Sequence, residues 1–230
     1  MVLSNLSLTY QQLGQWKQAT EAIASSLELL GYSAKKKAGG AGGAGEEIQN
    51  PKSKIQNPAI LAQALNTQGS LQLALGQAEQ ALNTWEQAAA NYAIAGDRIG
   101  TIQSQINSAQ ALQALGLYRR ALKNLYQVQS FQTQPDSQLK ATLLRNLGNT
   151  LRVVGDLDRS RQVLQESLAI AQQLRSPSDI GAALFSLGNT ARSQRDNTAA
   201  LAFYQQAAAI SPSEIAKLQA QLNQLSLLLE

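Results

Sequence analysis

Residues 143–167 read LLRNLGNTLRVVGDLDRSRQVLQES, and this stretch decides the fold. Its first half predicts one apolar helical face, because large apolar side chains recur at spacings of three and four, at Leu143, Leu144, Leu147, Leu151 and Val154. Gly148 lies one turn before Leu151, where a missing side chain would let a neighbouring helix come close. After Gly155 the second half presents a small, a large and a small residue, at Ser160, Leu164 and Ser167. The stretch therefore predicts two amphipathic helices that meet at a tight turn.

The same template recurs along the chain in five units, whose turns fall at Gly14, Gly76, Gly116, Gly155 and Arg195. Seven residues before each turn stands a small residue: Ser7, Gly69, Ala109, Gly148 and Gly188. Nine residues after each turn stands a bulky one: Ile23, Trp85, Leu125, Leu164 and Tyr204. A repeated helical hairpin of this kind cannot bury its apolar face alone and buries it against its neighbours. The sequence therefore predicts an all-α fold, a right-handed superhelical solenoid of five hairpins plus a C-terminal capping helix.

These columns resemble tetratricopeptide repeats over nearly the whole chain. The resemblance is carried by NLSLTYQQLGQWKQA at 5–19, TQGSLQLALGQAEQA at 67–81, RNLGNTLRVVGDLDRS at 145–160 and SLGNTARSQRDNTAALAFYQQAAAISP at 186–212. The last segment ends in the family's closing proline, Pro212, but Arg195 replaces the turn glycine, and Gln72 and Ala191 fill usually large positions. The last three turn spacings are 40, 39 and 40 residues, against about 34 in the family. The longer period resembles kinesin light chains and the arrays that precede caspase-like CHAT domains in cyanobacteria.

Repeat spacing and composition divide the chain into four predicted parts: a first hairpin at 1–32, an insertion at 33–57, four hairpins of about 40 residues each at 58–212, and a capping helix at 213–230. The insertion contains KKKAGGAGGAGEE, and we predict a flexible linker there because glycine and alanine between charges cannot pack. Its repeated IQNP units are similar to translated short DNA repeats of filamentous cyanobacteria, which suggests a source.

Capping residues predict several helix starts: Asn57-Pro58, Asp97, Ser176-Pro177 and Ser211-Pro212. In the last segment one apolar face is formed at spacings of three and four by Ile215, Leu218, Leu222 and Leu225. We interpret this segment as a capping helix that shields the last hairpin; the alternative is a coiled-coil seam. Its apolar end, and a first unit that begins almost at Met1, suggest a piece of a longer protein.

Composition excludes several classes of function. The chain has no histidine and no cysteine, so Ser-His-Asp and Cys-His nucleophile systems and histidine metal sites are impossible within it. Its 19 basic and 15 acidic residues are mixed along the chain rather than gathered in the dense basic stripe that nucleic-acid binding needs. The sequence has neither a membrane-spanning apolar run nor a secretory signal at its start, which predicts a cytoplasmic protein. We predict no enzyme activity, no cofactor, no metal, and neither a nucleic-acid nor a membrane partner.

The acidic pairs and the large aromatic residues have structural interpretations. The acidic pairs Asp156 with Asp158 and Glu46 with Glu47 lie in polar turns or loops, where caps and solvated charge are expected rather than catalytic carboxylates. The large aromatic residues at or beside packing positions are predicted to be core: Trp16, Trp85 and Tyr204.

The first helix of each hairpin lines the concave groove in the family that the chain resembles. Residues ten, six and three before each turn fall on one stripe of that helix, and in the last two units the stripe becomes rich in arginine and asparagine. The predicted partner-binding residues are Arg145, Asn149, Arg152, Asn189 and Arg192. Arg145 with Asn149 matches the basic-plus-asparagine pair with which the family's chaperone adaptors hold a peptide carboxylate, although Ser186 departs from that pattern. The alternative is a merely solvated concave surface.

These observations favour a non-catalytic protein–protein interaction scaffold. Its expected ligand is a protein or peptide segment that is acidic or ends in a C-terminal carboxylate. The resemblance implies that the chain is a fragment of a larger protein such as a CHAT-type protease. A free-standing adaptor and an oligomerisation module are the alternatives, and an enzyme is disfavoured.

Overall fold

The computed structural model describes residues 1–32, 57–128 and 135–229. Within these ranges all regular structure is helical, with no strand. The helices are α1 (Val2–Gln12), α2 (Trp16–Leu29), α3 (Pro58–Ala74), α4 (Ala78–Ile94), α5 (Arg98–Ala114), α6 (Tyr118–Gln127), α7 (Gln138–Val153), α8 (Leu157–Gln173), α9 (Pro177–Ser193), α10 (Asn197–Ile210) and α11 (Glu214–Leu228). The predicted flexible insertion at 33–57 lies outside the described residues except for Asn57. No described helix is long and apolar enough to cross a membrane.

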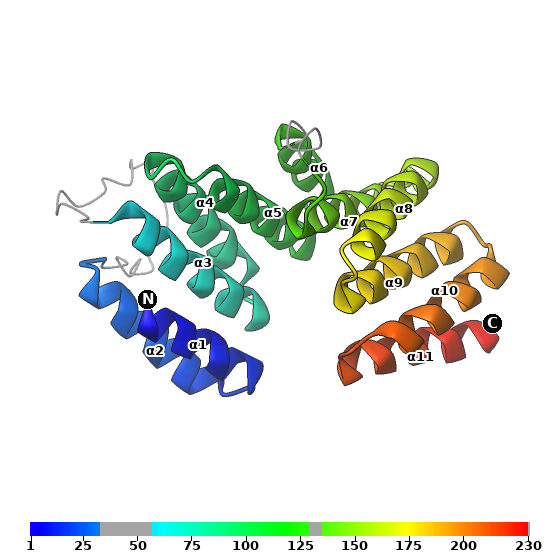
Figure 1. The fold of residues 1–230 in the computed structure, drawn as a ribbon, viewed down its shortest axis with the longest axis horizontal. Coiled ribbons are helices and arrows are strands. Elements are labelled where there is room, and N and C mark those ends of the chain that lie inside the picture. The colour runs from blue at the N-terminus through cyan, green and yellow to red at the C-terminus, as the bar shows by residue number, and fades with distance from the viewer. Residues whose placement is uncertain (33–56, 129–134, 230) are drawn as a thin grey trace, which may run out of the picture. The chain divides into compact units, whose positions relative to one another are not determined.

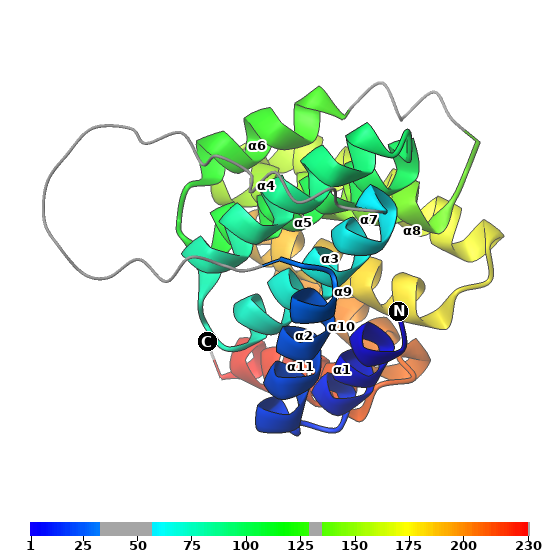
Figure 2. The same cartoon turned by 90° about the vertical axis from the view of Figure 1, so that its left-hand side faces the viewer.

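The helices form two compact units, Met1–Ser104 and Gln105–Glu230, and the division falls within α5. In the first unit α1 pairs with α2 and α3 with α4, and α3 packs on the first pair (Figure 2). In the second unit α7 pairs with α8 and α9 with α10, while α11 lies against α10 (Figure 1). The predicted all-α solenoid architecture of paired hairpins is confirmed. The superhelical hand stays a prediction.

The turn within each hairpin places one residue in the left-handed region. The backbone angle φ is 69° at Gly14, 77° at Gly76, 74° at Gly116, 91° at Gly155 and 62° at Arg195. Around Arg195 the helix ends in a Schellman motif, because the N–H of Asp196 bonds to the carbonyl of Ala191 and that of Arg195 to Arg192. The predicted turn position therefore requires a positive φ, which glycine adopts without steric cost. Arg195 adopts the same conformation despite its Cβ atom.

The small and large columns of the repeat meet inside three of the hairpins, at Gly69 with Trp85, Gly148 with Leu164 and Gly188 with Tyr204. A Cβ atom added to Gly148 would lie 2.5 Å from Leu164 Cγ, and one added to Gly188 would lie 2.6 Å from Tyr204 Cε1. Such distances are far below ordinary carbon–carbon contact, which is about 3.5 to 4.0 Å. The close approach predicted at Gly148 is confirmed, and Tyr204 is fully buried against the bare backbone of Gly188.

Three predicted caps are confirmed. The side chains of Asn57, Asp97 and Ser176 accept hydrogen bonds from the backbone N–H three residues on, at 3.2, 2.8 and 3.4 Å. The prediction for Ser211 is wrong: α11 begins at Glu214, and Ser213 is its N-cap. Ser211 instead ends α10 in an extended conformation, and its buried side chain fills the space left by the missing side chain of Gly181. Packing against α9 thus removes Ser211 from the cap position.

The last helix covers the last hairpin with a face opposite to the expected one. Ala220 and Leu227 are the buried residues of α11, and they pack into clusters around Ala207 and Tyr204 of α10. The apolar face that was interpreted as the shielding one points outward, with Leu222 64% exposed. Small Ala220 lets α11 approach α10 closely, which accounts for the choice of face.

Two of the three aromatic residues predicted to be core are buried, Trp85 at 2% exposure and Tyr204 at 0%. Trp16 is 42% exposed, so that prediction is wrong. Trp16 is the first residue of α2 and lies beside the packing column rather than in it. The inward position of this hairpin belongs to Ile23, which is buried.

Candidate partner-binding site

A cavity of about 490 Å³ lies in the second unit, and it is lined mainly by α7, α9 and the first half of α11. Gln113 of α5 and Tyr118 of α6 close one edge, and the α10–α11 connection contributes Ser211, Pro212 and Ser213. The first helices of successive hairpins thus form its walls, as the resemblance implied. We call this hollow the α7–α9 cavity.

Four of the five predicted site residues line this cavity. Arg145, Asn149 and Arg152 come from α7, where spacings of four and three place them on one face, and Asn189 comes from α9. All four side chains are half-buried, in helices whose neighbouring positions are core. The repeat register therefore brings together the residues that the sequence predicted on this stripe.

The fifth predicted residue, Arg192, does not line the cavity. Its Nη2 group donates a hydrogen bond to Ser226 Oγ of α11 at 3.2 Å. Arg192 thus joins α9 to the helix that follows the last hairpin. This contact to α11 was not predicted, because the sequence favoured the opposite face of α11 as the inward one.

The charged guanidinium of Arg145 is partly desolvated by burial. Burial lowers the pKa of its guanidinium, and the nearby Asp179 carboxylate partly opposes this shift. Asp179 itself accepts hydrogen bonds at the start of α9, from Ser176 Oγ at 2.6 Å and Gln138 Nε2 at 3.0 Å. Arginine remains protonated in proteins despite such shifts. Within the described residues Arg145 donates no hydrogen bond to the protein, so a partly desolvated cation faces the cavity.

Arg152 adds a second unsatisfied donor. Its Nε atom is buried and has no hydrogen-bond acceptor among the described residues. A buried donor without a partner costs about 1–3 kcal/mol. The cavity lining contains these two arginines and no acidic side chain among the described residues. An anionic group that entered the cavity would satisfy donors that the described chain leaves open.

Asn189 is held in place by the hairpin core. The hydroxyl of Tyr204 donates to Asn189 Oδ1 at 2.8 Å, and Tyr204 in turn packs on the ring of Phe185 at 5.7 Å between centroids. With its oxygen engaged, Asn189 keeps its Nδ2 donors for the cavity that it lines. The sequence predicted only a core position for Tyr204. The signal for its second role was a tyrosine at a buried packing position, since a buried phenol seeks a hydrogen-bond partner.

The apolar part of the lining was also missed. Phe185, Ala182 and Val153 lie beside the polar groups, and Ala216 of α11 continues this wall. Phe185 stands ten residues before the turn at Arg195, on the predicted groove stripe, but its role as an apolar wall was not predicted. The cavity can therefore take a charged group and an adjacent apolar side chain together.

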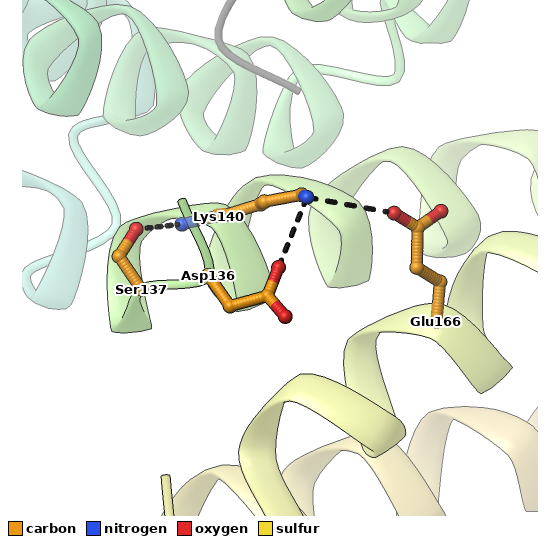
Figure 3. A network of polar contacts seen from close by, with 4 residues as sticks. All are labelled: Asp136, Ser137, Lys140 and Glu166. Atoms are coloured by element: carbon orange, nitrogen blue, oxygen red, sulfur yellow. Dashed lines mark hydrogen bonds and ion pairs between the residues drawn. The ribbon is translucent and has the colours of Figure 1, made fainter. Parts of the chain in front are cut away.

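A second charged cluster in the same unit has a structural role. Lys140 is 8% exposed, and its Nζ lies 3.1 Å from Asp136 Oδ1 and 3.9 Å from Glu166 Oε1 (Figure 3). Its backbone N–H also donates to Ser137 Oγ, the N-cap of α7 (Figure 3). These bonds fix the start of α7 against α8. The two carboxylates outnumber the one ammonium group, so the cluster keeps a net negative charge and does not attract an anionic segment.

Comparison with known families identifies the repeat. Residues 139–213, which contain most of α7 and all of α8 to α10, match the tetratricopeptide repeat family, and they include most of the α7–α9 cavity. This part of the chain is similar to tetratricopeptide repeats. A search of the curated proteins found no match.

Several solved structures share the fold. A thermophilic TPR protein of Thermus thermophilus has a TM-score of 0.67 at 19% identity, covering 99% of this chain and 98% of that one. BtubC of P. vanneervenii has a TM-score of 0.66 at 21% identity, with 90% and 78% covered. A Rap protein complexed with competence and sporulation factor has a TM-score of 0.66 at 14% identity, with 98% and 70% covered. At these identities the likeness shows the fold alone.

Proposed function

We propose that the chain is a non-catalytic interaction scaffold that holds a carboxylate-bearing peptide segment in the α7–α9 cavity. The observation that carries this proposal is the pairing of two arginines with amide side chains in a cavity whose described lining has no acidic side chain. A segment that is acidic, or that ends in its C-terminal carboxylate, fits this charge. The intended partner is a protein or peptide.

Each polar residue has a role that follows from its chemistry. The guanidinium of Arg145 donates two parallel hydrogen bonds to a carboxylate, and Arg152 supplies a further donor. Asn149 donates to a peptide carbonyl and accepts from a peptide N–H, which suits an extended chain. Asn189, oriented by Tyr204, offers donors to the same segment. The side chain next to the carboxylate lies against Phe185.

Two considerations support this class of function. Proteins of the tetratricopeptide repeat family are generally non-catalytic. The Rap protein that shares the fold was solved in complex with competence and sporulation factor, so the architecture accommodates a bound partner in that protein.

We further infer that the scaffold regulates a larger protein, such as a CHAT-type protease of a cyanobacterium. This inference rests on the repeat period near 40 residues and on the IQNP units. A free-standing adaptor is the alternative. The reading frame of the full-length gene distinguishes them, because a catalytic domain encoded beyond the array supports the first and its absence supports the second.

Binding of short peptides tests the proposed site. Fluorescein-labelled random peptide pools, one with free C-terminal carboxylates and one with C-terminal amides, are screened by anisotropy against the wild-type chain. The best peptide is then titrated against Arg145→Ala and Asn149→Ala. A charge-assisted bond contributes about 1.5 to 3 kcal/mol, so Arg145→Ala should weaken binding roughly ten- to a hundredfold.

The matched control is Arg159→Ala, an arginine on α8 of the same unit that does not line the cavity. This variant should bind as the wild type does, and thermal melts should show all three variants folded. Equal affinity of Arg145→Ala and Asn149→Ala with the wild type would remove the site assignment. Equal weakening by Arg159→Ala would indicate a general charge effect instead.

A further inference from the structure

The outward face of α11, together with its C-cap residue Leu229, carries an apolar stripe formed by Ile215, Leu218, Leu222, Leu225 and Leu229. These side chains are between 57% and 89% exposed. They lie opposite Ala220 and Leu227, the face that packs on the last hairpin. We call this set the α11 stripe. None of its members lines the α7–α9 cavity, so the stripe is independent of the proposed ligand site.

The spacing of the stripe is that of a coiled-coil seam. Its members follow one another at intervals of three, four, three and four residues, the pattern of a and d positions in heptads. The pattern is also nearly symmetric about Leu222. Ile215 and Leu229 each lie seven residues from Leu222, whereas Leu218 lies four residues before it and Leu225 three residues after it. An antiparallel copy of the same helix would therefore present leucine or isoleucine opposite, or within one residue of, every member of the stripe.

The flanks of the stripe are uncharged except at Glu214, which borders Ile215 at the start of α11. Gln219, Gln221 and Ser226 border it, and all are uncharged. The charged residues of α11, Glu214 and Lys217, lie in its first turn and are paired with each other at 2.7 Å. Charged flanking positions usually set partner choice in helix pairs, and like charges disfavour self-pairing. Since Glu214 is paired within its own helix, the self-complementary apolar seam is left to determine which helix pairs with α11.

We propose that the α11 stripe is the dimerisation surface of the protein, paired with the α11 stripe of a second copy in antiparallel orientation around a two-fold axis at Leu222. A two-fold contact uses the same surface on both copies, which is the symmetry that the stripe possesses. Burying one leucine or isoleucine side chain removes about 100 Å² from water, so five from each copy give a total of about 1,000 Å². This area is at the lower limit of specific interfaces and predicts a reversible dimer.

Sedimentation equilibrium of the full chain tests the proposal, at concentrations from about 1 to about 200 µM to suit an interface of this size. The wild type should form dimers reversibly. Leu222→Glu places two carboxylates against each other on the axis and should weaken association at least about a hundredfold. The matched control is Leu29→Glu, because Leu29 is an 80% exposed leucine on α2. Circular dichroism should show both variants folded, since both positions are exposed.

Cysteine variants test the orientation, because the chain contains no cysteine of its own. A disulfide needs Cα atoms within about 7 Å, and in the antiparallel pair the two Leu222 positions face each other. Leu222→Cys should therefore form a disulfide dimer on oxidation. The two Ile215 positions would lie about 21 Å apart at a rise of about 1.5 Å per residue, so Ile215→Cys should not link to itself. A mixture of Ile215→Cys and Leu229→Cys should link.

Three results would overturn the proposal. A wild-type chain that stays monomeric over the whole concentration range excludes the second copy, whatever else covers the stripe. Dimers that Leu222→Glu leaves intact place the interface elsewhere. Self-linking of Ile215→Cys with the efficiency of Leu222→Cys refutes the antiparallel arrangement.

Discussion

Substitution of Gly188 by alanine tests how the hairpins pack. The added Cβ would lie 2.6 and 2.7 Å from Cε1 and Cδ1 of Tyr204, so the fully buried ring must move by about 1 Å to restore contact at about 3.5 Å or more. Overpacking of this size costs about 1 to 3 kcal/mol. The same movement strains the hydroxyl bond to Asn189, worth about 1 kcal/mol. Alanine in place of glycine returns about 1 kcal/mol of helix propensity. The net loss should be about 1 to 3 kcal/mol.

A double-mutant cycle with Tyr204→Leu isolates the contact. The third unit has Ala109 and Leu125 in the equivalent positions, so alanine with leucine is a pair that the chain already uses. Gly188→Ala should therefore destabilise the wild type but be neutral or stabilising in the Tyr204→Leu background. Urea unfolding followed by circular dichroism measures the four proteins. An identical effect of Gly188→Ala in both backgrounds would refute the packing account.

Three further predictions concern the turns, the charges and the pH dependence. Arg195→Gly should raise the urea midpoint by the equivalent of about 1 kcal/mol, because Arg195 is left-handed at φ 62°, whereas Gly155→Ala at φ 91° should lower it. Lys140→Met should cost less than about 1 kcal/mol in the same assay, since the apolar stem is kept and both acids are exposed enough to hydrate; a loss of several kcal/mol would show that the ion pairs dominate. Burial, and then the charge of Asp97, raise the pKa of Tyr92 above its ordinary 10.0. Because the folded state disfavours the phenolate, the contribution of Tyr92 to stability is fully present below pH 10.0 and is lost as the pH rises through the folded pKa. Tyr92→Phe should therefore reduce the fall in melting temperature at alkaline pH.

The repeat could be predicted from the sequence because its determinants are local. A turn residue with positive φ, a small residue seven before it and a large one nine after it belong to one hairpin, and Gly148 with Leu164 shows how the small and large positions meet. The cavity residues followed from the same register, since Arg145 and Asn149 lie one turn apart on α7 and the repeat places Asn189 on the neighbouring helix.

What could not be predicted depends on contacts beyond one hairpin. The α11 helix has apolar residues on two opposite faces, and composition favoured the leucine face, whereas the small Ala220 face gives the closer fit to α10. The orientation of α11 then decides that Arg192 meets Ser226 rather than the cavity. The cap at Ser213 likewise depends on Ser211 filling the space beside Gly181 of another helix. Tyr204 gained its role toward Asn189 from the same non-local geometry.

The most direct test of the central claim is the energetic coupling between Arg145 and the ligand carboxylate. The best peptide from the pools is prepared in two forms, with its carboxylate and with that group replaced by an amide. Isothermal titration calorimetry measures both forms against the wild type and Arg145→Ala. The account predicts that the amide binds the wild type at least about tenfold more weakly, and that Arg145→Ala no longer distinguishes the two peptides. An equal effect of the amide on both proteins, or no effect on the wild type, would contradict it.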